Sequence, residues 1–329
     1  MPASKNDLRL VDLDEEGVDK AFRADVLQGL SEAQKAIPAR WLYDDAGSQL
    51  FEDITGLGEY YPTRAETEIL ASRGAEFAQA IGPGRAVVEF GSGSSVKTPL
   101  LLSQIDPAAY VPLDIAGDFL RASAEELGAK FPGLPVYPVE ADFMRRVELP
   151  EAVADLPKLG FFPGSTIGNM VARTAVDLLR TMRETLGESA KLLIGMDLVK
   201  DPAVLVAAYD DACGVTAEFN RNLARRINRE LAGTIPVDDL RHEARWIDDF
   251  ARIEMHLVAQ RDIAFEVAGR RFTMAAGESI HTENSHKFTR RSGNAILLAG
   301  GWTPVRRWLD GEQRFSLILA EASIPRSAP

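Results

Sequence analysis

The chain's 329 residues are 46% hydrophobic and 26% charged, a balance typical of a soluble globular protein with one large domain or two modest ones. A net charge of −12 argues against general binding to nucleic acid or anionic membranes, and no apolar run approaches the length of a membrane span. With the single cysteine Cys213 no internal disulfide can form, and the first residues lack a signal-peptide pattern, so we expect a cytoplasmic protein.

Apolar residues at helical spacing predict a first helix over residues 15–36. The next segment, residues 37–66, is rich in aromatic side chains. Core packing is the expected role of Trp41 and Phe51. A buried tyrosine needs a partner for its hydroxyl group, so some tyrosines of this segment are candidates for the wall of a ligand pocket.

From about residue 65 the pattern alternates between helices and short apolar runs. Helices are predicted at about 64–81, 116–130 and 172–187, and buried strands at 85–90, 109–114, 134–143, 158–164 and 191–197. Buried strands separated by helices predict a parallel sheet that is covered on both faces.

After Asp197 this alternation stops. Long helices are predicted at 201–233 and strands at 243–281, with a hairpin at Gly269; a helix at 291–299 and an antiparallel strand pair end the chain. We therefore predict a Rossmann-like α/β domain that ends in an antiparallel hairpin, interrupted by a second α+β domain. The expected limits are 1–62 for an N-terminal segment packing on the second domain, 63–197 and 287–329 for the α/β domain, and 198–286 for the insertion.

The segment VVEFGSGSSVKT, residues 87–98, reads as a strand, a tight glycine loop and a helix start. It completes neither of two phosphate-binding patterns. Lys97 and Thr98 follow Gly93 at the wrong spacing for a P-loop, and Val96 stands where a dinucleotide fingerprint that begins at Gly91 needs its third glycine.

Acidic residues at three predicted strand ends narrow the choice of ligand. Glu89 precedes the glycine loop, Asp114 ends the next strand and can bind ribose hydroxyls, and Asp142, followed by Phe143, can bind an adenine amino group. A carboxylate before the loop suits a cationic amino-acid tail better than a pyrophosphate. The combination favours S-adenosylmethionine (SAM) over a dinucleotide, with solvated strand ends as the alternative.

Four segments together resemble the bacterial histidine Nα-methyltransferases of ergothioneine biosynthesis: EFGSGSSVKT, FFPGSTIGN, DLVKDPAVLVAAYDDACGVTAEFNRN and GESIHTENSHKF. The resemblance runs from about Arg40 to the last predicted strand. It implies a SAM-binding α/β domain and a second domain that encloses histidine. It also implies three successive methyl transfers that yield hercynine, the first step of that pathway, and S-adenosylhomocysteine.

The resemblance also implies roles for individual positions. Cofactor contacts fall on Gly91, Lys97, Asp114, Asp142 and Phe143, with Tyr43 near the transferred methyl group, and the loop pattern itself adds Glu89 and Gly93 as cofactor candidates. Substrate contacts fall on Tyr60, Asn169, Tyr209, Glu283 and Ser285, and Gly164, Phe51 and Phe219 line the amine cavity. Met255, an apolar residue, is expected on the floor of the same pocket.

Methyl transfer from a sulfonium needs a neutral, aligned amine, and a free α-amine has a pKa of about 8. Proximity should therefore supply most of the catalysis. We take Tyr43 and Asn169 as the candidate catalytic positions, and Asn169 and Tyr209 as partners of the substrate carboxylate. The alternatives are a helix cap for Asn169 and core packing on a long helix for Tyr209. Aromatic walls attract a methylated ammonium through cation–π interaction.

The polar segment 277–288 is a poor match to a zinc site, because the spacing of His281, Glu283 and His286 fits no common pattern, and we expect no metal. If the segment is extended, Glu283 and Ser285 point the same way and can bind the two nitrogens of an imidazole. An exposed polar loop is the alternative. We expect structural or solvent-facing roles for His281, His286 and His256.

Three other functions stay open at this point. A relative that methylates tryptophan is opposed by Glu283, which would lie unpaired beside an indole. An NAD-dependent oxidoreductase lacks its third glycine, and a non-catalytic SAM-binding partner is the third possibility. The expected substrates are L-histidine and its mono- and dimethyl forms, handled by a monomer without nucleic-acid or membrane partners.

Overall fold

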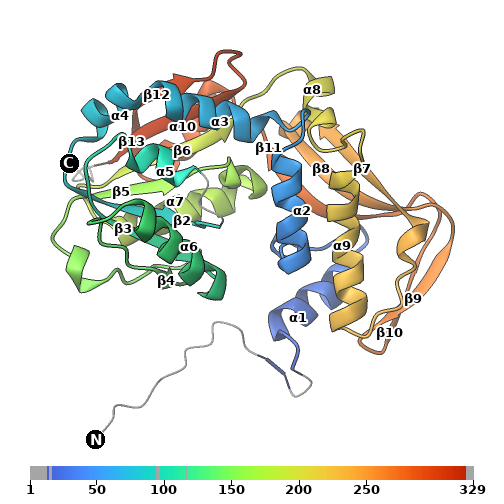
Figure 1. Ribbon diagram of the computed structural model, residues 1–329. Helices are drawn as coiled ribbons and strands as arrows, with labels where there is room; N and C mark the ends of the chain where they lie inside the picture. Colours follow the sequence, from blue (N-terminus) through green and yellow to red (C-terminus); the bar gives the residue numbers. More distant parts are fainter. Residues whose placement is uncertain (1–12, 15–16, 94–96, 116, 324–329) are drawn as a thin grey trace, which may run out of the picture. The chain divides into compact units, whose positions relative to one another are not determined.

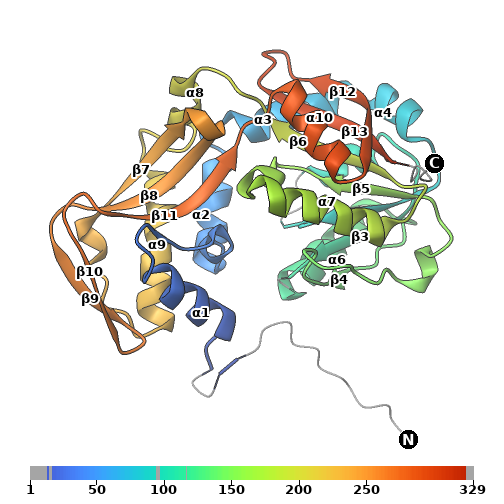
Figure 2. The same ribbon diagram turned by 180° about the vertical axis from the view of Figure 1, so that it is seen from behind.

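The computed structural model describes residues 13–14, 17–93, 97–115 and 117–323 (Figures 1 and 2). The chain divides into two compact units. Unit 1 comprises Met1–Tyr60 and Asp201–Ser285, and unit 2 comprises Tyr61–Lys200 and His286–Pro329. Among the described residues, no helix has the length and apolar character needed to cross a membrane.

Unit 2 contains a seven-stranded sheet in the order β12-β13-β6-β5-β2-β3-β4. Its parallel strands are β2 (Arg85–Phe90), β3 (Pro107–Asp114), β4 (Val139–Glu140), β5 (Lys158–Phe162) and β6 (Lys191–Asp197). The antiparallel strands β12 (Trp302–Leu309) and β13 (Phe315–Ala322) complete it. The predicted α/β class with its C-terminal hairpin is confirmed. Because β3 and β5 flank β2 on opposite sides, the strand order reverses beside β2, where ligands bind in such sheets.

Helices cover both faces of this sheet (Figures 1 and 2). On one face Val88 and Phe90 of β2 belong to a buried cluster with Leu178 and Leu297, which lie on α7 (Ala172–Leu186) and α10 (Arg290–Ala299). On the other face Val87 belongs to a cluster with residues of α3 (Tyr61–Ser72), α4 (Gly74–Ile81), α5 (Thr98–Leu102) and α6 (Gly117–Lys130). The alternation along β2 thus gives each face its own core.

The predicted strand over residues 134–143 is mostly wrong. Within this segment only Val139–Glu140, strand β4, pairs with β3 as a regular strand, and Val136 forms a single bridge with Tyr110. Pro135 and Pro138 explain the difference, because proline has no N–H group to donate to a neighbouring strand. The predicted helix over 64–81 is likewise two helices, α3 and α4, with Arg73 outside the helical region between them.

Unit 1 contains a four-stranded sheet in the order β1-β11-β8-β7. Its strands are β1 (Lys35–Ala36), β7 (Leu240–Ile247), β8 (Arg252–Ala259) and β11 (Ser279–His286). A separate hairpin joins β9 (Ile263–Val267) to β10 (Arg270–Met274). The φ angles of Ala268 and Gly269, 47° and 73°, are those of the predicted tight hairpin turn.

The helices of unit 1 are shorter than predicted. They are α1 (Lys20–Gly29), α2 (Asp45–Thr55), α8 (Pro202–Ala207) and α9 (Val215–Glu230). Asp19 caps α1 by accepting from two backbone N–H groups, and residues 15–16 lie outside the described residues. The helices predicted over 201–233 are α8 and α9, and only α9 is long. The Asp211 carboxylate accepts from Val215 N and Thr216 N at the start of α9.

Short 3₁₀ turns complete both units: η1 (Ala39–Leu42), η4 (Val237–Asp239) and η5 (Asp248–Phe250) in unit 1, and η2 (Glu151–Val153) and η3 (Thr166–Asn169) in unit 2.

Candidate active site

The glycine loop of unit 2 leaves the carboxyl end of β2 with a left-handed backbone. Gly91 and Gly93 have φ angles of 72° and 46°, which favour glycine. Gly93 N donates to Asp114 Oδ2 over 3.0 Å, and a Cβ added to Gly91 would lie 3.3 Å from the ring of Phe143. The structure thus brings together four of the predicted cofactor residues. The position of Val96 lies outside the described residues.

Glu89 lies beneath this loop. Its side chain is 1% exposed, and Oε2 accepts from Thr98 Oγ1 over 2.6 Å and from Tyr110 Oη over 2.5 Å. Burial raises the pKa of Glu89 to about 7, against the lowering effect of these two hydroxyl donors. These contacts hold Glu89 in place under the loop, and its direct contact with the cofactor stays a prediction.

Asp142 and Phe143 follow β4. Asp142 Oδ1 accepts from Met144 N over 3.0 Å, which turns the chain at this point. The Phe143 ring meets Phe90 and Phe162 edge-on, with centroids 6.4 and 6.1 Å away. The aromatic neighbour of the third acidic residue is therefore anchored in the core of the sheet, beside Gly91.

A buried carboxylate that the sequence analysis missed connects Lys97 with Gly164. Glu66, on α3, is fully buried, and its Oε2 accepts from Lys97 Nζ over 2.6 Å and from Gly164 N over 2.8 Å. The φ angle of Gly164 is 78°. One acidic side chain therefore holds two predicted ligand-binding positions. Glu66 belongs to no recognisable motif and lies within the amphipathic helix α3.

Asp197, at the end of β6, is the centre of a second buried network in unit 2. Its carboxylate lies 2.6 Å from Lys200 Nζ and 2.8 Å from Lys287 Nζ, and accepts from Tyr61 Oη over 2.8 Å. Although burial opposes it, Lys287 and then Lys200 hold the pKa of Asp197 below its ordinary value. Burial lowers the pKa of Lys200 to about 8. Tyr61, Lys200 and Lys287 stand where the chain passes between the two units.

Asn169 lies at the end of η3 in unit 2. The alternative in which it caps the following helix is wrong, because Val171 occupies the N-cap of α7 and makes no side-chain capping bond there. The preceding Gly168 accepts from His286 Nδ1 through its carbonyl over 2.8 Å. His286 is therefore a scaffold residue for the turn that carries Asn169.

Unit 1 gathers Tyr43 and four of the predicted substrate residues, Phe51, Tyr60, Tyr209 and Phe219, into one aromatic cluster. Tyr43 lies 5.5 Å from Phe51 and 5.4 Å from Phe219 between ring centroids, and Phe51 lies 6.1 Å from Phe219. Tyr60 joins the cluster through Phe51 and Tyr209, at 6.2 and 6.0 Å. The rings come from α2, α9 and three connecting segments, so folding alone brings them together.

Two polar residues of β11 belong to this region. Ser285 Oγ lies 2.7 Å from Tyr209 Oη, and Glu283 and Ser285 are 8% and 4% exposed. Atoms packed around the hydroxyl of Tyr43, and next the nearby Glu283 carboxylate, raise the pKa of Tyr43 well above its ordinary value, although 38% of the residue is exposed. The segment is thus an extended strand and not the exposed loop that the sequence left open. Tyr209 lies in the turn after α8, which corrects its predicted place on a long helix.

Met255 is 1% exposed on β8. Strand alternation turns its side chain away from the face that carries Glu254 and His256. Its carbonyl accepts from Thr282 Oγ1 over 3.1 Å, which ties β8 to β11.

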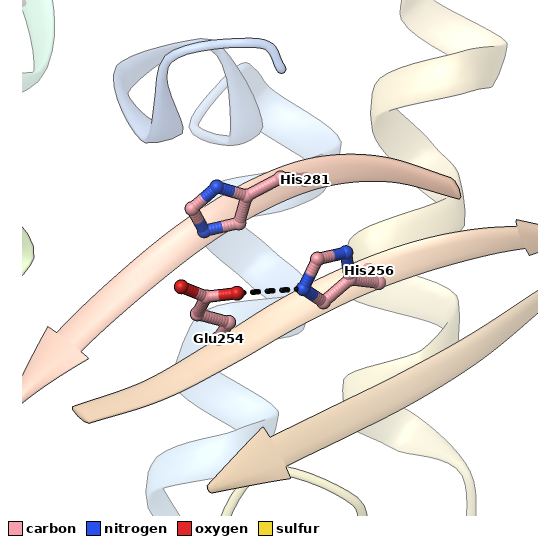
Figure 3. Close-up of side chains that lie close together, drawn as sticks. All are labelled: Glu254, His256 and His281. Carbon is pink, nitrogen blue, oxygen red and sulfur yellow. Dashed lines mark hydrogen bonds and ion pairs between the residues drawn. The ribbon is translucent and has the colours of Figure 1, made fainter. Parts of the chain in front are cut away.

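His256 and His281, the two histidines of unit 1 that we expected to have structural or solvent-facing roles, lie side by side on neighbouring strands. His256 of β8 and His281 of β11 have ring centroids 5.0 Å apart, and His256 Nε2 lies 3.0 Å from Glu254 Oε2 (Figure 3). One ligand atom from each of the three residues lies within 4.8 Å of the others. Spacing within residues 277–288 could not show this group, because two of its members stand on β8.

Comparisons with known proteins agree with this geometry. Residues 22–322 match the model of a family described as histidine-specific methyltransferase, SAM-dependent. The histidine N-alpha-methyltransferase of Mycolicibacterium smegmatis is 41% identical, over 92% of this chain and 95% of that protein. The Mycobacterium tuberculosis protein of the same name is 40% identical, over 94% and 97%.

Two further likenesses are more distant. Ergothioneine biosynthesis protein 1 of Neurospora crassa is 31% identical over 88% of this chain and 33% of that protein. The solved structure of magnesium protoporphyrin IX methyltransferase from Synechocystis has a TM-score of 0.46 at 10% identity, over 85% of this chain and 95% of that chain. From the family match and the extent of its near relatives, the chain belongs to the SAM-dependent histidine-specific methyltransferases.

Proposed function

We propose that this enzyme transfers three methyl groups in succession to the α-amine of L-histidine, giving hercynine for ergothioneine biosynthesis. The observation that carries the proposal is that Glu283 and Ser285 both lie on β11 next to the aromatic cluster of unit 1. An imidazole has one N–H donor and one acceptor nitrogen, and a carboxylate with a hydroxyl two residues away on one strand suits both.

The residues of unit 2 fit S-adenosylmethionine. Asp114 stands at the end of β3 beside a loop whose glycines keep side chains away, and Phe143 offers an aromatic surface beside Gly91. The glycine loop follows β2, and the strand order of the sheet reverses beside β2, where a nucleoside is expected. We assign Asp114 to the ribose hydroxyls, Asp142 and Phe143 to the adenine, and Lys97 to the amino-acid end. When bound, SAM supplies a methyl group on an electrophilic sulfonium.

The chain's own contribution is binding and orientation. Glu283 and Ser285 are assigned to the imidazole, and Tyr209, whose hydroxyl lies 2.7 Å from Ser285 Oγ, is assigned to the substrate carboxylate. Tyr43, near the Glu283 carboxylate, is proposed to border the amine. Asn169, Gly164, Tyr60 and Met255 remain proposed contacts from the resemblance. Alignment of a neutral amine then accounts for most of the rate.

Successive methylation changes the amine from a hydrogen-bond donor into a bulky cation. Aromatic faces accept that change, because their attraction for a cation does not depend on N–H groups. The cluster of Tyr43, Phe51 and Phe219, with centroids 5.4 to 6.1 Å apart, supplies such faces from one unit. We therefore expect mono- and dimethylhistidine to be substrates of the same enzyme. As separate expectations, we propose that the enzyme is monomeric and cytoplasmic.

Mass spectrometry of single amino acids incubated with the enzyme and SAM tests the proposal. Histidine should gain one, two and then three methyl groups, while tryptophan and the other amino acids stay unchanged. Mono- and dimethylhistidine should both be converted to the trimethyl product. Methylation of tryptophan in place of histidine, or binding of SAM without any product, would contradict it.

A further inference from the structure

We propose that Glu254, His256 and His281 of unit 1 form a binding site for one divalent transition-metal ion of the zinc class. The three side chains come from β8 and β11, which are neighbours in the four-stranded sheet. Figure 3 shows the two imidazoles side by side, with a nitrogen of each turned toward the Glu254 carboxylate. Their ligand atoms lie within 4.8 Å of one another.

The residue types select the metal. Two imidazoles and a carboxylate suit zinc and its neighbours in the first transition row, whereas calcium and magnesium prefer oxygen donors alone. Three protein ligands leave a further coordination position for water. Glu254 and His281 are each partly exposed, so an ion can reach the group from solvent, while His256 is 3% exposed.

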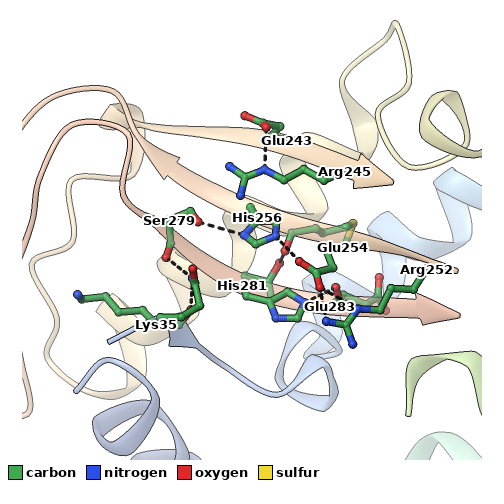
Figure 4. Close-up of polar contacts among 12 residues, drawn as sticks. Lys35, Glu243, Arg245, Arg252, Glu254, His256, Ser279, His281 and Glu283 are labelled. Atoms are coloured by element: carbon green, nitrogen blue, oxygen red, sulfur yellow. Dashed lines mark hydrogen bonds and ion pairs between the residues drawn. The ribbon is translucent and has the colours of Figure 1, made fainter. Parts of the chain in front are cut away.

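Groups around the three ligands hold them as outer residues of metal sites do. Ser279 Oγ lies 3.1 Å from His256 Nδ1, on the far side of the ring from Glu254 (Figure 4). A hydroxyl can donate or accept, so it serves the tautomer with a free Nε2 as well as the metal-free one. Arg252 binds Glu254 Oε1 over 2.8 Å, which leaves Oε2 directed at His256.

The surroundings of His281 also permit a change of tautomer. In the metal-free chain its Nε2–H donates to the Glu283 carbonyl over 2.9 Å. The Asn284 side chain borders the same ring, and its amide oxygen is an acceptor. A proton on Nδ1, which frees Nε2 for a metal, therefore has an acceptor nearby.

The site would also join two strands. His256 stands on β8 and His281 on β11, so the ion would cross-link β8 to the strand that carries Glu283 and Ser285. Coordination would use the neutral imidazoles, each of which carries one lone pair.

Cobalt titration of the full chain tests the site. Tag-free protein, stripped with chelator, is titrated with Co²⁺ in the absence of histidine and SAM, so that the result is independent of the proposed methyl transfer. We expect visible d–d absorption that saturates at one equivalent and is displaced by Zn²⁺. Zinc should also raise the temperature of unfolding, because it binds the folded chain preferentially.

Matched variants locate the ion. His256→Ala and His281→Ala should abolish the saturable cobalt spectrum, and Ser279→Ala should weaken binding about 10-fold by removing an outer partner. His286→Ala, which removes an imidazole of unit 2, is the control and should bind as the wild type does. Unchanged binding in both His256→Ala and His281→Ala would overturn the assignment.

X-ray absorption of the zinc-loaded wild-type protein needs no variant and covers the case in which a substitution impairs folding. Two imidazoles in the ligand shell are expected. A shell without imidazole, or no saturable binding of either ion, would show that the three residues form only a hydrogen-bonded network.

Discussion

The two units build their candidate sites in different ways. In unit 2 the proposed cofactor residues stand at strand ends that the parallel sheet gathers, and buried charges such as Glu66 and Asp197 fix the surrounding backbone. In unit 1 the proposed substrate residues are mainly rings from separate elements, beside two polar side chains of β11. Substitution of the buried charges of unit 2 should therefore change the free energy of unfolding most. Substitutions in the proposed substrate residues of unit 1 should change which substrate is used.

Removal of the Asp197 carboxylate should have the largest effect. Asp197→Ala leaves the fully buried Lys287 ammonium, 2.8 Å from Asp197 in the wild type, without its counter-charge. We expect a loss of about 3–5 kcal/mol in the free energy of unfolding, measured with urea. Asp197→Asn should lose less, because an amide oxygen still accepts from Tyr61.

A surface ion pair provides the control for this comparison. Asp177 and Arg180, 3.5 Å apart, are both more than half exposed, so Asp177→Ala should change stability by less than about 1 kcal/mol. An equally small effect of Asp197→Ala would contradict the role of buried charge in unit 2.

The pKa of Glu89, the other buried carboxyl group considered in unit 2, is shifted in the opposite direction to that of Asp197. Its pKa is raised from 4.5 to about 7 in the folded chain, so between these values the unfolded chain releases the proton first. The wild type should therefore lose stability as pH rises from about 4.5 to about 7, by up to about 3 kcal/mol.

Glu89→Gln removes this titration while keeping an acceptor for Thr98 and Tyr110. Urea unfolding at several pH values should show the variant gaining on the wild type across that window. Parallel stability curves for the two proteins would contradict a raised pKa at this position.

Sequence reasoning succeeded where local pattern decides structure. The bounds of β2 and β6 match the predicted strands because each is a continuous apolar run in a buried parallel sheet. The glycine loop and Asp114 meet because strand ends in such a sheet share one edge. The proximity of the glycine loop, Asp114 and Phe143 in unit 2 was therefore predictable from the chain, while their contact with a cofactor stays a prediction.

Prediction from the sequence failed where contacts between residues far apart in the chain determine the structure. Glu66 lies in an ordinary helix, and only the folded chain shows that it binds Lys97 and Gly164. The grouping of His281 with Glu254 depends on the pairing of β8 with β11, which no spacing along the chain reveals. The aromatic cluster was predicted through the resemblance and not through any periodic signal.

In unit 1 the largest expected effect belongs to Glu283. Glu283→Ala removes the proposed charged hydrogen-bond partner of the substrate imidazole, which should lower kcat/KM for histidine roughly 10- to 100-fold. SAM affinity, measured by calorimetry, should stay unchanged. Unaltered histidine kinetics would contradict the assignment of the imidazole to β11.

Asp114→Ala is the matching substitution in unit 2 and should show the reverse separation. It removes the proposed ribose partner and the acceptor of Gly93 N, so SAM affinity should fall about 10-fold. At saturating SAM the KM for histidine should be unaffected. Undiminished SAM affinity in calorimetry would show that Asp114 serves only the loop.

The smallest effect sharpens the comparison within unit 1. Ser285→Ala removes one neutral hydrogen bond, to the Tyr209 hydroxyl 2.7 Å away, and the proposed second partner of the imidazole. A loss of about 1 kcal/mol, or roughly fivefold in kcat/KM for histidine, is expected from such a bond. Tyr209→Phe removes the same bond from its other end and leaves the Ser285 hydroxyl in place. If Ser285 contacts the imidazole and Tyr209 the carboxylate, the double variant should lose more activity than either single variant, because each residue then has a ligand contact of its own. A double variant no worse than the single ones would mean that the pair acts only as a structural bond within unit 1.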